Sequence, residues 1–227
     1  MANDLKHLGI IPDGNRRYAK KLSKKPWKGH QEGSEKLEQV IRWLGDTDVQ
    51  KVTVYSLSWE NLNKRPRDEF NYLMKLFKNK SLEKAESEEV HENEICFKVV
   101  GKHDKLPKEV TGAFKKLEKA TKDYDNLIIN LAVAYSGRQE VLHAFKEIKE
   151  NGLEINEENV EKNLWIDGDS PEMIIRTGGE KRLSNFLLWQ SAYSELYFID
   201  KMWPEIEKED INKALEEYRD RERRFGK

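Results

Sequence analysis

The sequence has almost no cysteine. Cys96 is the single cysteine among 227 residues. A disulfide within the chain is therefore excluded, and a metal site built on several cysteines is disfavoured. Cys96 lies within an apolar run, so we expect a small buried side chain rather than a reactive thiol.

Long apolar runs are also missing. No segment approaches the roughly 20 apolar residues that a membrane-spanning helix needs. The first residues, Met1 to Asp4, are polar and lack the apolar stretch of a signal peptide. We expect a cytoplasmic protein; this composition is still compatible with peripheral contact with a membrane surface or with the handling of a lipid.

Neither sign of charge is in excess. The 41 Lys and Arg residues nearly cancel the 42 Asp and Glu residues, leaving a formal net charge of -1. A general nucleic-acid binder usually carries a basic excess, so we expect no nucleic-acid partner. Phosphate binding would have to come from a local cluster of basic residues.

The chain also lacks a linker rich in Pro, Gly or Ser, which predicts a single domain over residues 1–227. Short apolar runs alternate with longer amphipathic segments. We expect strands at residues 7–11, 51–57, 95–100, 127–134, 173–176 and 196–199. We expect helices at residues 33–44, 68–91, 108–122, 138–151, 157–164 and 208–224. This alternation predicts an α/β fold with a central, mostly parallel six-stranded sheet flanked by helices.

Ligands of such sheets bind beyond the carboxyl ends of the strands. The first expected strand is followed by Asp13, Gly14, Asn15, Arg16 and Arg17. A glycine allows close backbone approach, a helix start favours anions, and the two guanidinium groups match phosphate oxygens. The carboxylate of Asp13 is a reasonable Mg²⁺ ligand beside a phosphate. A plain turn before a basic helix explains this segment equally well when it is taken alone.

Two further strand ends carry polar groups. The residues in question are Ser58, Glu60, Asn61 and Arg65 after the second strand, and Arg176, Arg182 and Ser184 after the fifth. Ser and Asn are also common helix N-caps, and His30 by itself is a weak signal. Neither a Walker phosphate loop nor a Gly-x-Gly-x-x-Gly dinucleotide motif occurs. Three such strand ends together nevertheless favour a substrate with several phosphate groups and a metal.

Longer motifs then become recognisable. They are His-Leu-Gly-Ile-Ile-Pro-Asp-Gly-Asn-Arg-Arg at 7–17, Gly-His-x-x-Gly at 29–33, Ser-x-Glu-Asn at 58–61, Ile-Arg-Thr-Gly-Gly-Glu-x-Arg-Leu-Ser-Asn-Phe-Leu-Leu-Trp-Gln at 175–190, Glu-Leu-Tyr-Phe at 195–198 and Arg-Glu-Arg-Arg-Phe-Gly at 221–226. With these motifs the sequence resembles the cis-prenyltransferases, the family of undecaprenyl diphosphate synthases and their archaeal relatives. The resemblance spans nearly the whole chain.

The resemblance implies a homodimer whose α/β domain contains a hydrophobic product tunnel. It implies a Mg²⁺-dependent reaction in which isopentenyl diphosphate extends an allylic diphosphate of the geranyl, farnesyl or geranylgeranyl type. The product would be a cis-polyprenyl diphosphate of short to medium length.

The resemblance also implies roles for individual residues. Asp13 and Glu195 would bind Mg²⁺, and Asp13 and Asn61 would be catalytic. A neutral amide is a poor base, so we expect Asn61 to orient a group while a phosphate oxygen takes the proton. The residues expected to bind substrate are Gly14, Asn15, Arg16, Arg17, Tyr18, His30, Ser58, Glu60, Arg65, Arg176, Arg182 and Ser184.

Apolar residues at helical spacing would line the tunnel. They are Phe70, Leu73 and Phe77, with Leu62 shortly before them. The bulk of the two phenylalanines favours a limited tunnel, and Phe70→Ala is expected to lengthen the product. The same spacing is equally typical of an ordinary helix face packed on a core.

Other functions stay open at this stage. One is a variant of the same fold that joins its units head to middle. Another is a non-catalytic partner subunit of a prenyltransferase, in which loss of the aspartate in the first motif would be expected; Asp13 is present. A third is a phosphate-binding protein without chemistry, which the convergence of acidic and basic residues disfavours.

Overall fold

A computed structural model of the chain describes residues 4–62, 64–166 and 170–220. Its sheet has six strands in the order β3-β4-β2-β1-β5-β6, and every pairing is parallel. The strands are β1 (His7–Ile11), β2 (Lys51–Ser58), β3 (Ile95–Val100), β4 (Leu127–Tyr135), β5 (Met173–Arg176) and β6 (Glu195–Phe198). The predicted α/β class and six-stranded sheet are confirmed, and the strand limits differ from the prediction by no more than one residue.

The α-helices of the described residues are α1 (Asn15–Lys21), α2 (Pro26–Leu44), α3 (Trp59–Leu62), α4 (Arg67–Ala85), α5 (Glu88–Glu92), α6 (Lys108–Thr121), α7 (Gly137–Glu150), α8 (Glu157–Asn163) and α9 (Lys208–Asp220). Short 3-10 helices lie at η1 (His103–Lys105) and η2 (Trp203–Glu205). Residues 221–224 of the last predicted helix lie outside the described residues.

Two predicted helix limits were wrong. The helix expected at 33–44 begins seven residues earlier, with Pro26 in its first turn, where a missing N–H costs nothing. The helix expected at 68–91 is two helices, because the chain is extended at Ser87. This break carries Val90 into the core, where it is 3% exposed.

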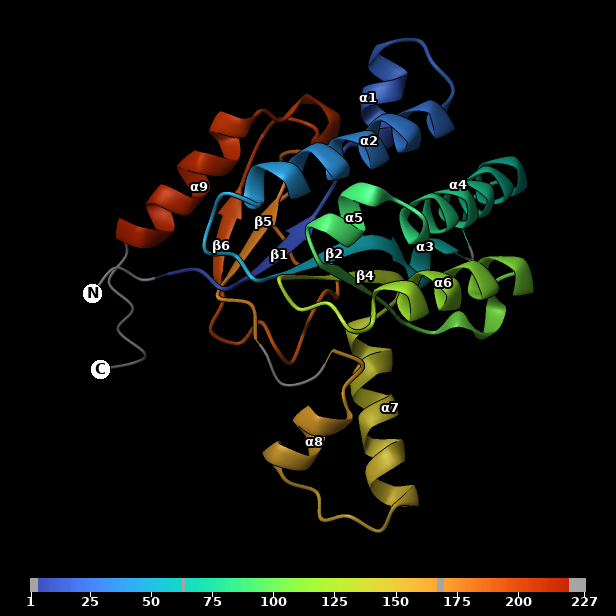
Figure 1. Ribbon diagram of the computed structural model, residues 1–227, viewed down its shortest axis with the longest axis vertical. Coiled ribbons are helices and arrows are strands. Elements are labelled where there is room, and N and C mark those ends of the chain that lie inside the picture. The colour runs from blue at the N-terminus through green and yellow to red at the C-terminus, as the bar shows by residue number, and fades with distance from the viewer. Residues whose placement is uncertain (1–3, 63, 167–169, 221–227) are drawn as a thin grey trace.

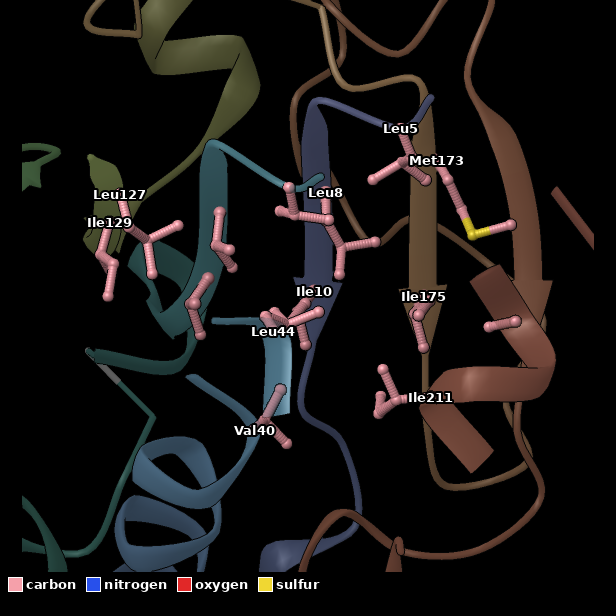
Figure 2. Close-up of a cluster of buried hydrophobic side chains, with 14 of the residues drawn as sticks. Leu5, Leu8, Ile10, Val40, Leu44, Leu127, Ile129, Met173, Ile175 and Ile211 are labelled. Atoms are coloured by element: carbon pink, nitrogen blue, oxygen red, sulfur yellow. The ribbon is translucent and has the colours of Figure 1, made fainter. Parts of the chain in front are cut away.

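The main core lies on one face of the sheet. Alternate residues of the strands point to this face, as the two-residue period of a strand requires, and Leu8 and Ile10 of β1 are examples. Val40 and Leu44 of α2 and Ile211 of α9 cover them (Figure 2). Helices α7 and α8 lie on the opposite side of the sheet (Figure 1), where Ile148 and Val160 form a separate cluster.

Helices α1 and α2 pack closely at the carboxyl end of β1. A Cβ atom at Gly29 would lie 1.9 Å from the carbonyl oxygen of Asn15, so only glycine fits between the helices. The indole N–H of Trp203 donates to the carbonyl oxygen of Gly33, at 2.8 Å. The glycines therefore allow close helix packing here, and Gly29 lies inside α2, four residues before the predicted start of the helix.

Candidate active site

A cavity of about 440 Å³ lies beyond the carboxyl ends of β1, β2 and β5. Its lining comes from Ile11, Pro12, Asp13, Gly14, Asn15, Arg16, Arg17, His30, Tyr55, Ser56, Leu57, Ser58, Asn61, Lys64, Arg65, Arg176 and Ser184. The structure thus brings together most of the residues that the sequence singles out. Ser56 was missed; it is the unpaired residue of an irregularity in β2, where the register passes from Tyr55 to Leu57.

Asp13 lies where the groups from β1 and β5 meet. One carboxylate oxygen is 2.7 Å from the guanidinium of Arg176, and the other is 3.3 Å from that of Arg17. The N–H of Gly14 also donates to this second oxygen, at 2.6 Å. Gly14 has a φ of 106°, a left-handed conformation that favours glycine. Asp13 thereby connects the basic segment after β1, which contains Arg17, with the one at the end of β5, which contains Arg176.

Arg176 is 4% exposed and is held by several partners. Its NH1 group donates to the Ser184 hydroxyl at 2.7 Å and to the carbonyl oxygen of Arg182. Its Nε–H is buried and has no hydrogen-bond partner within the part of the chain that the structure describes. The same is true of the Nε–H of Arg65. Buried guanidinium donors of this kind suit an anionic ligand that enters the cavity.

Glu69 of α4 is a further site residue that the sequence analysis missed. It is 2% exposed, and its Oε1 lies 2.9 Å from His30 Nε2 and 3.4 Å from Arg16 Nε. Arg65, four residues earlier and just before α4, also pairs with this oxygen. The i,i+4 spacing of Arg65 and Glu69 was the available signal in the sequence. Glu69 therefore gathers three basic side chains that line the cavity.

The surroundings set the charge states of this cluster. Burial lowers the pKa of His30, and the neighbouring charges of Arg65 and Arg16 lower it further, against the opposing hydrogen bond to Glu69. Burial alone would raise the pKa of Glu69, but His30, Arg65 and Arg16 together bring it below its ordinary value. At neutral pH the cluster therefore contains a carboxylate, two guanidinium groups and a neutral imidazole.

The turn after β2 carries Ser58, Glu60 and Asn61. The Ser58 hydroxyl accepts from the backbone N–H of Asn61 at 3.1 Å, and both side chains line the cavity. Glu60 is exposed and accepts from the side-chain amide of Asn185 at 2.8 Å. That amide also donates to Ser136 at 2.6 Å. Asn185, which the sequence analysis did not assign, therefore connects three segments around the cavity.

Several predicted residues lie elsewhere. Tyr18, Glu60 and Arg182 are not among the residues that line the cavity, and the Arg182 side chain pairs with Glu180. Glu195 begins β6 and pairs with Met173 at the amino end of β5. Asp13, in contrast, follows the carboxyl end of β1. A single chain therefore does not bring Glu195 and Asp13 together.

Two smaller hollows continue from the cavity between α2, α4 and the sheet. The first has a volume of about 100 Å³, shares Pro12, Asn15, His30 and Ser56 with the main cavity, and is lined by Leu73 and Phe77 among others. The second has a volume of about 90 Å³ and is also lined by Phe77. Leu62 and Phe70 line neither hollow; they pack in a core cluster with residues of α6 and β4, to which Leu73 and Phe77 also belong. Of the four predicted tunnel residues, two thus face this channel.

A magnesium site made by the protein alone is not apparent. No group of three His, Cys, Asp or Glu side chains suited to a metal occurs within residues 4–62, 64–166 and 170–220. Asp13 supplies one carboxylate beside the basic lining of the cavity. Mg²⁺ is commonly held by one or two carboxylates together with substrate phosphates, so this donor set fits Mg²⁺ that arrives with a diphosphate.

The part of the chain that the structure describes has no helix both long and apolar enough to cross a membrane.

Comparisons with known proteins agree with this geometry. A family model described as putative undecaprenyl diphosphate synthase matches residues 11–226. A Methanopyrus kandleri protein named tritrans,polycis-undecaprenyl-diphosphate synthase (geranylgeranyl-diphosphate specific) is 48% identical, over 97% of this chain and 84% of that protein.

Solved structures are similar along the whole chain. A probable undecaprenyl diphosphate synthase from Campylobacter jejuni has a TM-score of 0.85 and 33% identity, covering 99% of this chain and 100% of the other. Lavandulyl diphosphate synthase from Lavandula x intermedia, in complex with dimethylallyl diphosphate, has a TM-score of 0.90 and 32% identity, with 98% of each chain covered. The chain belongs to the undecaprenyl diphosphate synthase family of prenyltransferases.

Proposed function

We propose that this protein condenses isopentenyl diphosphate with an allylic diphosphate to give a cis-polyprenyl diphosphate of short to medium length. One observation carries the proposal: a basic cavity at the sheet edge opens into an apolar channel through the shared residues Asn15, His30 and Ser56. A prenyl diphosphate has a highly charged head and a hydrocarbon tail, and this cavity and channel are complementary to both parts.

The cavity offers places for two diphosphates. Arg16, Arg17 and His30 surround the start of α1 and would hold the allylic diphosphate, whose tail would enter the channel. Arg176 and Ser184 would hold isopentenyl diphosphate on the other side of Asp13. The ion pairs of Asp13 with both Arg17 and Arg176 support two anionic subsites that share one carboxylate.

In the proposed reaction, the bond between the allylic carbon and the diphosphate oxygen breaks. The terminal alkene carbon of isopentenyl diphosphate forms the new carbon–carbon bond, and one proton leaves. The arginines stabilise the negative charge that develops on the departing diphosphate. Asn61 would orient a reacting group near Ser58, and a phosphate oxygen would accept the proton.

The cofactor in this proposal is Mg²⁺, held by Asp13 and the diphosphate oxygens. When bound, the ion adds Lewis-acid stabilisation to the leaving diphosphate. The nearby guanidinium groups position the same diphosphate and offset its negative charge. Glu195 of the same chain lies too far from Asp13 to bind this ion with it, so its predicted role as a metal ligand requires a second chain.

We propose a homodimer in which a second copy supplies Glu195. Glu195 lies three residues before Phe198, which pairs with Arg176 at the carboxyl end of β5. Three residues of extended chain span about 10 Å, more than a glutamate side chain can bridge. Strand β6 ends the sheet order beside β5, and Leu142, Phe145 and Tyr193 are exposed large hydrophobic side chains, which supports a protein partner.

The primer is proposed from the relatives. The 48% identical Methanopyrus protein is named as geranylgeranyl-diphosphate specific, which favours that primer over geranyl and farnesyl diphosphate. Head-to-middle joining remains the alternative, because a lavandulyl diphosphate synthase has the same fold. The geometry of the new double bond and the branching of the product distinguish the two reactions.

The test is incubation of the purified protein with isopentenyl diphosphate, Mg²⁺ and each allylic diphosphate in turn. Products are identified by mass spectrometry and NMR. We expect linear, cis-extended products with geranylgeranyl diphosphate as the best primer. If no prenyl product forms with any primer, the proposal fails; a branched product would establish the alternative.

A further inference from the structure

Charged side chains line part of the second hollow of the apolar channel. The second hollow is lined by Leu37, Ile41, Phe77, Phe97, Leu117 and Leu131, and also by Ser34, Ser56, Glu38, Lys80, Ser81 and Lys84. Lys80 lines both hollows, so it lies where the first passes into the second. Of the residues that line the second hollow, Ser56 alone also lines the main cavity, so the carboxylate and the two ammonium groups lie in the part of the channel away from that cavity.

These three residues form a connected cluster between the two helices that flank the channel. Glu38 of α2 pairs with Lys80 and Lys84 of α4, each at 2.9 Å. The exposed fractions of the side chains are 18% for Glu38, 30% for Lys80 and 16% for Lys84. Arg42 lies 3.9 Å from Glu38 and extends the cluster along α2. The cluster is therefore partly shielded from water and fixed from both helices.

Charged groups oppose the passage of a hydrocarbon chain. A prenyl chain that moved past the cluster would remove water from the carboxylate and the ammonium groups, or separate them from one another. Either change is unfavourable, because buried charges require partners and hydration that hydrocarbon cannot supply. The apolar residues nearer the active site impose no such penalty.

We propose that the cluster of Glu38, Lys80 and Lys84 is the closing wall of the product channel and limits the length of the polyprenyl chain. This inference rests on the proposed prenyltransferase function. With each condensation the tail of the product moves one isoprene unit deeper into the channel. When the tail reaches the wall, the next condensation has to disrupt the ion pairs, and release of the product then competes with elongation.

The test compares product lengths by mass spectrometry under identical conditions. The variant Glu38→Ala/Lys80→Ala/Lys84→Ala removes all three side chains at once and leaves none of them charged and unpaired. We expect the main product to become longer by one or more isoprene units. A second variant, Lys80→Met, keeps the length of the side chain, removes one charge and leaves the pair of Glu38 with Lys84; it should shift the product in the same direction.

The matched control is Lys78→Ala/Glu109→Ala. This pair also connects α4 to a neighbouring helix, α6, at 2.6 Å, but neither residue lines the channel hollows. Its product lengths should equal those of the wild type. The inference would be overturned if a folded Lys80→Met protein made products of wild-type length. It would also be overturned if the control variant lengthened the product equally. Absence of product from the wild type would instead refute the proposed function.

Discussion

Asp13 and Arg176 form a 2.7 Å ion pair that joins the loop after β1 to the end of β5. The pair connects residues that are far apart in the sequence and lie on neighbouring strands. Arg17 contacts the other oxygen of the same carboxylate. Both proposed diphosphate subsites therefore meet at Asp13, and this arrangement has consequences for metal binding.

Binding of Mg²⁺ should depend on diphosphate. Without substrate, Arg17 and Arg176 offset the negative charge of Asp13, so the ion meets a cationic environment. A bound diphosphate reverses this balance and adds oxygen ligands. We expect Mg²⁺ to bind at least about tenfold more tightly when inorganic diphosphate is present.

Calorimetric titration with Mg²⁺, with and without inorganic diphosphate, measures the difference. The affinity of Mg²⁺ for free diphosphate is determined separately and subtracted. Tight Mg²⁺ binding to the protein alone would contradict the expectation. It would indicate a metal site made wholly by protein groups.

Glu69→Gln should reduce stability and increase the response to diphosphate. The change preserves the size of the side chain but leaves Arg16 and Arg65 without their buried counter-charge. Removing one partner of a buried ion pair typically costs about 3 kcal/mol, so the melting temperature should fall. Inorganic diphosphate should then raise the melting temperature of the variant more than that of the wild type, because it replaces the missing negative charge.

Thermal unfolding with and without inorganic diphosphate tests this prediction. Glu109→Gln removes an exposed carboxylate and is the control; its melting temperature should change little. Equal shifts by diphosphate in wild type and Glu69→Gln would show that Glu69 does not oppose the ligand.

The stability of the protein should decrease below neutral pH, in part through His30. Burial lowers the pKa of His30, so the unfolded chain takes up a proton at a higher pH than the folded protein does. Stability from this residue is thus complete above the unfolded pKa of about 6.5 and is lost as the pH falls towards the folded pKa. Denaturant unfolding between pH 8 and 5 should therefore show a flatter pH dependence for His30→Gln, and identical slopes would contradict this assignment.

Asn185→Ala should weaken the use of isopentenyl diphosphate. Asn185 joins Glu60 to Ser136 and lies next to Ser184 in the loop that contacts Arg176. Loss of these hydrogen bonds should displace the loop, raise KM for isopentenyl diphosphate and lower kcat/KM about tenfold, as misplaced binding groups do. Steady-state kinetics with each substrate varied in turn would show the effect. Asn151→Ala, at the exposed end of α7, is the control, and an equal loss in both variants would indicate a general effect on folding.

Much of the fold could be predicted from the sequence, because the strands of a buried parallel sheet are short apolar runs with clear limits. The errors in the helix limits arose where packing between elements distant in the sequence determines the local structure. Residues 26–32 were not predicted as helical, yet they lie inside α2, where α1 packs against Gly29. Ser87 interrupts a continuous charged segment and directs Val90 to the core.

The site was predictable where motif residues follow strands, as Asp13 and Arg176 do. Glu69 was missed because its i,i+4 spacing from Arg65 does not reveal the contacts with α1 and α2 on which its role depends. For Phe70, helical periodicity could not show that the side chain lines neither hollow, whereas Phe77 on the same helix lines both. The structure therefore moves our expectation of a longer product from Phe70→Ala to Phe77→Ala. Mg²⁺, the homodimer, cytoplasmic location and membrane contact stay predictions.

The central claim is that Asp13 organises condensation at this site, and Asp13→Asn tests it most directly. The amide is similar in shape and can still accept from Gly14, but it has no charge for Mg²⁺ or for the two arginines. The measurement is the rate at which isopentenyl units are incorporated with geranylgeranyl diphosphate as primer and saturating Mg²⁺. The account predicts a loss of about 100-fold or more, with the folded state retained. A rate equal to that of the wild type would contradict it.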